Sequence, residues 1–368
     1  MPGMKLQDKV ASITGALGDM GREFASAIAR ELAENAPSSW HGMSFDLWRQ
    51  NERGTVRRAA MAPALRELAS GLRFPEGPVA MRDGSVILVE IEGRRLTRIE
   101  PEGKRSTIAT FGGSPNGAAI GPDGKCYVCN SGGFSWQEDE LGLRPTGEPE
   151  DYSGGRIERV DLATGAVERL YDRTEHGPLR GPNDIVFDRS GGFWFTDSGK
   201  ARRRSIDRGG VYYARPDGSF IAEVGYPMFT ANGVGLSPGE EWLYVAETQT
   251  GRIWRFELDG PGSIKRRPWP SPHGGSLLTT LPDYGLCDSL AVDAEGNICL
   301  ATLMRGGITI ISPDGVQMAH IPLPDRYVTN LCFGGPELRT AYVTLSQSGR
   351  LIAMEWPQPG LPLNFLQR

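Results

Sequence analysis

The sequence predicts an all-β fold: a six-bladed β-propeller with four strands in each blade, preceded by a short N-terminal βα appendage. Three observations lead to this prediction. Six stretches repeat one pattern, a polar start followed by an apolar strand, a glycine-bearing turn and a second strand. Apolar alternation on both sides of such a turn is typical of a β-hairpin. A second hairpin opened by glycine follows each stretch, and the unit recurs about every 40–65 residues, as propeller blades do.

The repeated stretch is clearest at Leu179–Ser198, LRGPNDIVFDRSGGFWFTDS. The other copies lie at Phe74–Glu90, Pro115–Asn130, Ala231–Glu247, Cys287–Leu303 and Thr329–Leu345. When the copies are aligned on their turns, one polar residue stands near the start of every first strand: Glu76, Asn116, Asn183, Asn232, Asp288 and Asn330. Because the first strands of propeller blades lie beside the central axis, we expect these six side chains to form a ring at one mouth of the channel.

The N-terminal residues 1–36 do not belong to the repeat. Val10–Thr14 reads as a short strand, Gly15–Gly21 as a turn and Arg22–Glu34 as an amphipathic helix. This unit resembles the opening of short-chain dehydrogenases, whose turn has the pattern TGxxxGxG. Asp19 stands where the middle glycine would let the backbone approach a pyrophosphate, and its charge would repel that group. We therefore expect a fusion remnant and no bound nucleotide.

Residues 37–62 are polar and irregular and are predicted to be a linker, and residues 63–368 to be the propeller domain. Ala64–Gly71 reads as a strand that closes the propeller by pairing with the last blade, which removes an open sheet edge. Two insertions, Ser131–Ser153 and Arg266–Gly285, are expected to emerge on the same face as the ring and to shape a binding mouth. Candidates for lining that mouth are Trp136, Tyr152, Trp269, His273 and Tyr284.

Composition and charge narrow the possible partners. The net charge of -5 argues against a nucleic-acid surface, and Arg202–Arg204 is the only basic run. Five cysteines, an odd number without a signal peptide, indicate reduced thiols and a cytoplasmic location. Cys126 and Cys129 alternate to opposite faces of one predicted strand, which favours two core thiols over a redox or zinc pair. No apolar run is long enough to span a bilayer, so no membrane partner is expected. The oligomeric state is left open.

The ring residues predict a cation site. Glu76 and Asp288 would repel each other in a narrow channel unless a cation lay between them. Carboxylate and amide oxygens are hard ligands suited to Ca²⁺ or Mg²⁺. No His or Cys occupies a ring position, which disfavours a thiolate or imidazole zinc site, but oxygen-ligated Mn²⁺ or Zn²⁺ remains open.

Four motifs, in order, resemble the senescence-marker-protein/gluconolactonase family, which includes regucalcin and luciferin-regenerating enzyme. They are FPEGP with Glu76, R-x-x-N-D with Arg180, Asn183 and Asp184, ANGVGLSPG with Asn232, and CDSLAVDAEGNICLAT with Asp288. The resemblance covers residues 64–357 and implies a six-bladed propeller that uses one divalent metal ion to hydrolyse sugar lactones, small-molecule substrates. One departure is that the family usually places its Arg two residues before the Asn, whereas Arg180 precedes Asn183 by three.

The resemblance also implies roles for individual residues. Glu76, Asn232 and Asp288 would hold the metal ion, most simply Ca²⁺. Asn183 would lie beside the metal or its bound water, so we count it both as a ligand and as a substrate contact. Asp288, able to touch metal and water together, would be the general base. Asn116, Arg180 and Asn330 would contact the substrate.

Three other function classes are weighed against this one. More distant relatives with the same propeller and calcium ring hydrolyse phosphotriesters or organophosphates, which a substrate panel would distinguish. A binding or scaffold propeller would lack metal dependence, and the paired carboxylates argue against it; a non-catalytic metal-binding propeller is kept as an alternative. A nicotinamide oxidoreductase would need the nucleotide site that residues 6–34 lack. No Gly-x-Ser-x-Gly motif offers a serine nucleophile.

Overall fold

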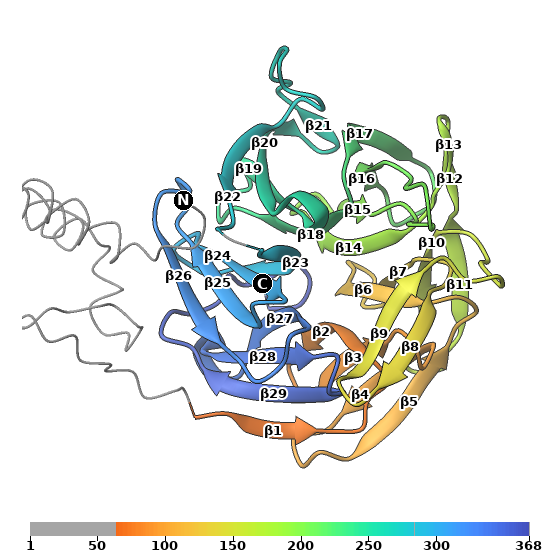
Figure 1. Ribbon diagram of the computed structural model, residues 1–368, viewed down its shortest axis with the longest axis vertical. Helices are drawn as coiled ribbons and strands as arrows, with labels where there is room; N and C mark the ends of the chain where they lie inside the picture. The colour runs from red at the N-terminus through yellow and green to blue at the C-terminus, as the bar shows by residue number, and fades with distance from the viewer. Residues whose placement is uncertain (1–63, 283, 368) are drawn as a thin grey trace, which may run out of the picture. The chain divides into compact units, whose positions relative to one another are not determined.

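The computed structural model describes residues 64–282 and 284–367, so the expected N-terminal βα unit and the whole of the expected linker lie outside the described residues. The described chain forms six antiparallel sheets around a channel (Figure 1). Two short 3₁₀ turns, η2 (Thr248–Thr250) and η3 (Pro336–Leu338), interrupt the strands. Within this part of the chain, no helix is both long enough and apolar enough to cross a bilayer.

The sheets follow one another along the chain, each beginning at the channel. The first sheet consists of β2 (Pro75–Ala80), β3 (Val86–Glu90), β4 (Arg95–Ile99) and β5 (Arg105–Thr110). The second consists of β6 (Pro115–Ile120), β7 (Cys126–Asn130), β10 (Arg156–Val160) and β11 (Val167–Tyr171). The third consists of β14 (Pro182–Phe187), β15 (Phe193–Asp197), β16 (Gly209–Ala214) and β17 (Ile221–Met228). Two small hairpins project from the second and from its link to the third: β8 (Ser135–Asp139) with β9 (Gly142–Gly147), and β12 (Arg173–Thr174) with β13 (Gly177–Pro178).

The other three sheets complete the circle. The fourth sheet consists of β18 (Ala231–Leu236), β19 (Trp242–Glu247), β20 (Arg252–Gly260), β21 (Ser263–Ile264) and β22 (Ser276–Thr280). The fifth consists of β23 (Leu286–Val292), β24 (Ile298–Leu303), β25 (Gly307–Ile311) and β26 (Met318–Pro322). The sixth consists of β27 (Val328–Gly334), β28 (Thr340–Leu345), β29 (Arg350–Glu355) and β1 (Arg66–Ala69). Neighbouring inner strands contact one another in a closed cycle: β2, β6, β14, β18, β23, β27 and back to β2. The predicted six-bladed β-propeller is therefore confirmed.

The predicted closing strand is also present. β1 pairs antiparallel with β29, with Arg66 opposite Ala353 and Glu67 opposite Ile352. The sixth sheet thus contains the first described strand and the last three, which joins the two ends of the propeller. Pairing covers the outer edge of β29, which would otherwise expose unpaired backbone groups.

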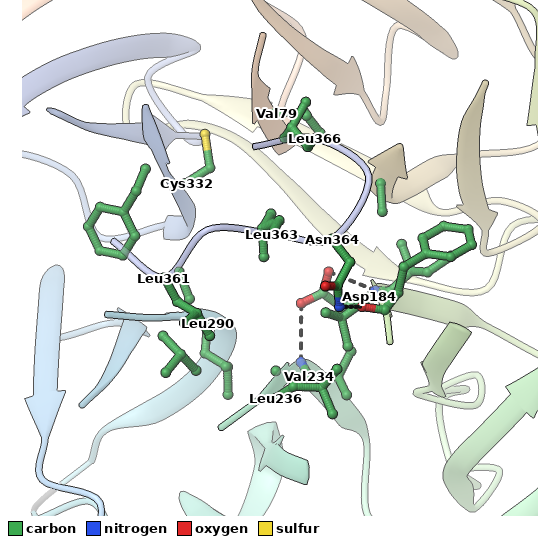
Figure 2. A pocket seen from close by; sticks show the side chains of 18 of the residues that line it. Val79, Asp184, Val234, Leu236, Leu290, Cys332, Leu361, Leu363, Asn364 and Leu366 are labelled. Atoms are coloured by element: carbon green, nitrogen blue, oxygen red, sulfur yellow. Dashed lines mark hydrogen bonds between the residues drawn. The ribbon is translucent and has the colours of Figure 1, made fainter. Parts of the chain in front are cut away.

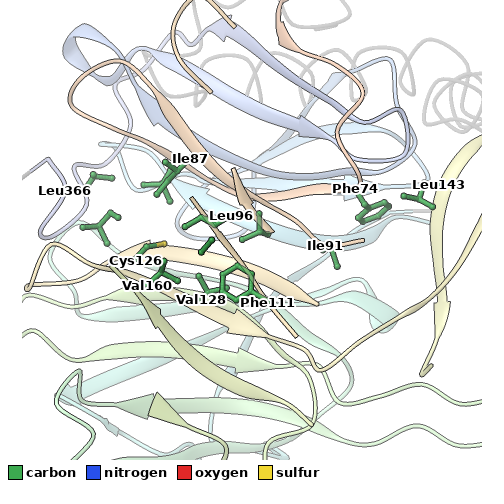
Figure 3. Packing of buried hydrophobic residues seen from close by; sticks show 14 residues of the cluster. Phe74, Ile87, Ile91, Leu96, Phe111, Cys126, Val128, Leu143, Val160 and Leu366 are labelled. Carbon is green, nitrogen blue, oxygen red and sulfur yellow. The ribbon is translucent and has the colours of Figure 1, made fainter. Parts of the chain in front are cut away.

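The apolar core lies between adjacent blades rather than in one central mass. Figure 3 shows one cluster between the first two blades, where Ile87 and Leu96 face Cys126 and Val128. All of these side chains are fully buried because both faces of each sheet pack against a neighbour. This burial explains why the second strands read as nearly continuous apolar runs.

The C-terminal segment crosses one end of the channel. Leu361 N–H donates to the carbonyl of Val292 at the end of β23, and Asn364 Nδ2 donates to the carbonyl of Phe187 at the end of β14. Leu366 then joins the core cluster of the first two blades. A cavity of about 110 Å³ lies between this segment and Asp184 (Figure 2). The tail therefore covers the channel at the end where the inner strands finish, leaving the other end as the mouth.

Candidate functional site

The six ring positions expected from the repeat all fall within the first three residues of an inner strand. Because the inner strands run in the same direction around the cycle, these positions gather at one end of the channel. Five of the six side chains are at most 8% exposed, and Asp288 is partly exposed. Residues separated by more than 250 positions are thereby brought together, as the bond from Asn330 Nδ2 to Glu76 Oε2 at 2.8 Å demonstrates.

Each inner strand changes its pairing register beside its ring residue. The shifts lie between Glu76 and Val79, Pro115 and Ala118, Pro182 and Ile185, Ala231 and Val234, Cys287 and Leu290, and Val328 and Asn330. An irregularity of this kind bends a strand and re-aims its side chains, and it is common next to active sites. Six equivalent bulges explain how buried polar side chains share one end of the channel.

Three ring residues, Glu76, Asn116 and Asn232, are followed by a glycine because the next inner strand lies too close for a side chain. A Cβ on Gly77 would stand 2.7 Å from the Asn116 carbonyl oxygen, and its φ of 53° also favours glycine. A Cβ on Gly117 would stand 2.5 Å from the Asn183 carbonyl oxygen. The Glu-Gly and Asn-Gly pairs therefore mark close approach of neighbouring strands rather than hairpin turns.

Three carboxylates meet in the ring, one more than the sequence analysis placed there. Burial raises the pKa of Glu76 well above its usual range, and the charges of Asp288 and Asp184 raise it further. Burial also raises the pKa of Asp288, although that side chain keeps some exposure, and the charge of Asp184 adds to the effect. Burial raises the pKa of Asp184 to about 7. In the described chain, none of the three carboxylates forms an ion pair with a basic side chain.

Asp184 and Ser289 were given no role in the site by sequence reasoning, although Asp184 belongs to the R-x-x-N-D motif. Each directly follows a ring residue, at the position where Glu76, Asn116 and Asn232 are followed by glycine. A polar side chain at that position was the available signal. The Asp184 carboxylate accepts from the N–H groups of Ile185 at 3.0 Å and Val234 at 3.2 Å, so it points into the channel between the third and fourth blades.

A chain of hydrogen bonds joins ring residues from three blades through Ser289 of the fifth blade. Asn330 Nδ2 bonds Glu76 Oε2, and the Ser289 hydroxyl lies 3.3 Å from Glu76 Oε1 and 3.5 Å from Asn232 Oδ1. Asn232 Nδ2 donates to Thr248 Oγ1 at 3.1 Å. The Asn330 amide oxygen accepts from Leu331 N–H at 2.7 Å. Asn330 thus supports Glu76 directly, and its predicted contact with substrate stays a prediction.

The remaining predicted residues differ in exposure. The Asn183 side chain is buried, and its Oδ1 has no hydrogen-bond partner. Asn116 is 5% exposed and lies beside Gly77. Arg180 is exposed at the segment leading into β14, and its guanidinium forms no ion pair within the described residues. The roles proposed for these residues remain predictions.

The insertion after the second strand of the second blade does lie on the face of the ring. Its Trp136 packs on Phe74 with ring centroids 5.1 Å apart, and the Leu143 N–H donates to the carbonyl of Gln347 in the sixth blade. The Tyr152 hydroxyl donates to the Arg180 carbonyl at 2.6 Å. The insertion therefore reaches from the second blade over the first to the sixth.

The expectation for the second insertion was wrong in part. Ser276–Thr280 forms β22, the outer strand of the fourth blade, so residues 266–275 connect two strands at the opposite end from the ring. Trp269 is 90% exposed there, and His273 is buried against Trp254, so neither lines the mouth. Tyr284 and Gly285 lead into β23 at the mouth, and Tyr284 is exposed. The sequence pattern missed β22 because its apolar character is weak.

Comparison with known proteins agrees with this geometry. Residues 74–347 match the SMP-30/Gluconolactonase/LRE-like region family. The chain is 30% identical over 267 residues to lactonase drp35 of Staphylococcus haemolyticus, covering 72% of this chain and 74% of the relative. It is 27% identical over 300 residues to a gluconolactonase of Zymomonas mobilis, covering 73% and 75%.

A solved structure described as a putative gluconolactonase has the same fold. It superposes with a TM-score of 0.63 at 25% identity, covering 82% of this chain and 95% of that chain. The family match spans all six ring residues, from Glu76 to Asn330. The chain belongs to the SMP-30/gluconolactonase/LRE-like family, whose relatives named here are lactonases.

Proposed function

We propose that this protein is a divalent-metal-dependent hydrolase that opens a sugar (aldono-)lactone to the corresponding sugar acid. The observation that supports this most directly is that Glu76, Asp184 and Asp288 meet at the end of a narrow channel, where the described residues include no basic ion-pair partner for them. The pKa values of all three carboxyl groups are raised, so positive charge supplied at this point would favour their ionised forms. The relatives are named as a lactonase and a gluconolactonase, which supports a lactone as the substrate class.

The donor atoms fit a hard cation. Within the described residues, no three His, Cys, Asp or Glu side chains together form a metal site, so a cation here would also need amide oxygens. The unpartnered Asn183 Oδ1 is a buried acceptor of that kind. Glu76, Asn183, Asn232 and Asp288 would hold the ion, and their all-oxygen donor set favours Ca²⁺ over metals that prefer nitrogen or sulfur.

When bound, a divalent cation keeps these carboxylates ionised and polarises the lactone carbonyl oxygen. The protein's own part is to position water and move its proton. Asp288 is the most exposed of the three carboxylates, so it can accept the proton of the water whose oxygen attacks the carbonyl carbon. The ring C–O bond then breaks, and the same proton returns to the leaving oxygen. General-base assistance of this kind contributes about 10²–10⁴-fold.

The substrate would enter from the mouth, because the C-terminal segment covers the other end of the channel. Arg180 stands exposed there with no ion-pair partner in the described chain, so its guanidinium is available to the hydroxyl or carbonyl oxygens of a sugar lactone. Asn116 would hydrogen-bond the ring hydroxyls from the second blade. A polar mouth above a carboxylate ring suits a small hydroxylated lactone.

A pH-indicator assay tests this function. The purified protein, stripped of metal, is offered aldonolactones, aliphatic lactones and a phosphotriester, each with Ca²⁺, Mg²⁺, Mn²⁺ or Zn²⁺ in turn. We expect acid release from aldonolactones that requires an added cation, and loss of that release in Glu76→Gln. Hydrolysis of the phosphotriester alone would move the protein to the alternative class, and activity without any divalent ion would contradict the proposal.

A further inference from the structure

A second position of the repeat is polar in four blades and lies next to the ring. It is the last residue of the second strand, 14 or 15 positions after the ring residue of the same blade. In the first four blades it is occupied by Glu90, Asn130, Asp197 and Glu247. All four side chains are at most 2% exposed. In the last two blades the same position holds Leu303 and Leu345.

Each of the four buried acceptors bonds the backbone just before the ring residue of its own blade. The N–H groups that donate lie two or three positions before that residue. The bonds are Arg73 N to Glu90 Oε2 at 2.8 Å, Ser114 N to Asn130 Oδ1 at 3.0 Å, Arg180 N to Asp197 Oδ2 at 2.7 Å, Gly181 N to Asp197 Oδ1 at 2.7 Å, and Phe229 N to Glu247 Oε1 at 2.5 Å. A carboxylate that accepts backbone N–H groups makes short, charge-assisted bonds of high positional specificity.

The arrangement is most complete at Asp197. Both of its oxygens accept hydrogen bonds: Oδ2 accepts from the Arg180 N–H, and Oδ1 accepts from the Gly181 N–H and from the Gly199 N–H at 2.8 Å. The Arg180 peptide is held on both sides, by Asp197 at its N–H and by the Tyr152 hydroxyl at its carbonyl. The next residues, Asn183 and Asp184, both belong to the ring. The direction in which their side chains enter the channel therefore depends on how this segment is anchored.

We propose that Asp197 is a positioning residue for the lactonase site: by fixing the Arg180–Gly181 backbone it sets the orientation of Asn183 and Asp184 in the ring. Glu90, Asn130 and Glu247 perform the same task for Glu76, Asn116 and Asn232. The inference rests on the proposed function, since it assigns these residues to the geometry of that site. Partners that orient ligand residues in this way typically contribute about 10–100-fold to affinity or activity.

The test compares Asp197→Asn with Asp188→Asn. Asparagine keeps the volume of Asp197 but replaces one acceptor oxygen with an NH₂ group that faces a backbone donor. Asp188 is a matched control in the same blade: it is 5% exposed and accepts from the Ser190 N–H at 2.9 Å, but it lies at the opposite end of the β14–β15 hairpin. The readouts are Ca²⁺ affinity by calorimetry, kcat and KM on an aldonolactone, and melting temperature.

We expect Asp197→Asn to lower Ca²⁺ affinity or kcat about 10–100-fold while KM changes less than threefold. Asp188→Asn should lose a similar amount of melting temperature but keep its Ca²⁺ affinity and its kcat within threefold of the wild-type values. Wild-type affinity and kcat in Asp197→Asn, or equal losses in the two variants, would overturn the proposal.

A structural readout separates this inference from the proposed function. If the wild-type chain opened no lactone, the proposed function would fail, but hydrogen exchange of residues 180–185 would still decide the positioning role. Exchange there should be about tenfold faster in Asp197→Asn than in the wild type or in Asp188→Asn. Unchanged exchange would show that Asp197 does not hold this segment.

Discussion

Removing divalent cations should make the stability of this protein fall as pH rises. Glu76, Asp184 and Asp288 have raised pKa values in the folded chain because they are buried together. A carboxyl whose pKa is higher in the folded than in the unfolded state keeps its proton longer when folded. Stability is therefore full below pH 4 and is lost as pH rises towards and through the folded pKa. Positive charge in the ring would cancel this loss.

The size of the effect can be worked from Asp184 alone. The difference between a folded pKa of about 7 and the usual 3.8 corresponds to about 4 kcal/mol of unfolding free energy lost by pH 7 and above. At about 2 °C per kcal/mol for a domain of this size, the melting temperature should fall by about 8 °C. Glu76 and Asp288 act in the same direction, so this is a lower bound for the cation-free protein.

The assay is thermal unfolding at pH 5, 6, 7 and 8, with either EGTA or excess Ca²⁺. We expect the melting temperature to fall with pH in EGTA and to be much flatter in Ca²⁺, because an ion that binds only the folded state adds stability. Asp184→Asn should flatten the EGTA curve. A melting temperature that stays constant or rises from pH 5 to 8 in EGTA would refute the reasoning. So would a double variant, Glu76→Gln with Asp288→Asn, whose melting temperature Ca²⁺ raises as much as it raises that of the wild type.

Four further outcomes are expected. Asp288→Asn should lose at least about 10²-fold in kcat at saturating Ca²⁺, the share of a general base, and full rescue by excess Ca²⁺ would show that Asp288 is only a ligand. Asn116→Ala should keep its metal content by elemental analysis but raise KM; loss of stoichiometric metal would make Asn116 a ligand. A chain starting near Met61 should fold and keep its turnover, whereas a well-folded but inactive truncation would give the N-terminal segment a role. Burial lowers the pKa of Lys200 to about 7, so the unfolded chain keeps that proton to a higher pH than the folded chain does. The unfolding free energy of the wild type should therefore rise between pH 7 and 9, by up to about 1.4 kcal/mol per pH unit relative to Lys200→Met in urea titrations. Parallel curves for the two proteins would contradict this.

The sequence by itself was sufficient for the blade count and the ring. Glycine turns and apolar alternation are local properties, and a propeller repeats them with one register, so aligning the turns identified Glu76 and Asn330 as neighbours although they lie far apart in the chain. The closing strand could be predicted for a related reason: an unpaired edge must be covered, and Ala64–Gly71, where the structure has β1 (Arg66–Ala69), was the strand left over.

Tertiary structure decided what depends on contacts between blades. In the sequence Asp184 is only the last residue of the R-x-x-N-D motif, and packing against β18 makes it a third channel carboxylate with a raised pKa. Residues 266–275 lie at the opposite end of the channel from the ring because β22 follows them, and the pairing of β22 with β20 is clear only in the folded sheet. The anchoring of Arg180 by Asp197 joins the segment before β14 to the end of β15, 17 residues later. Such features arise from burial and distance, which a repeat pattern does not encode.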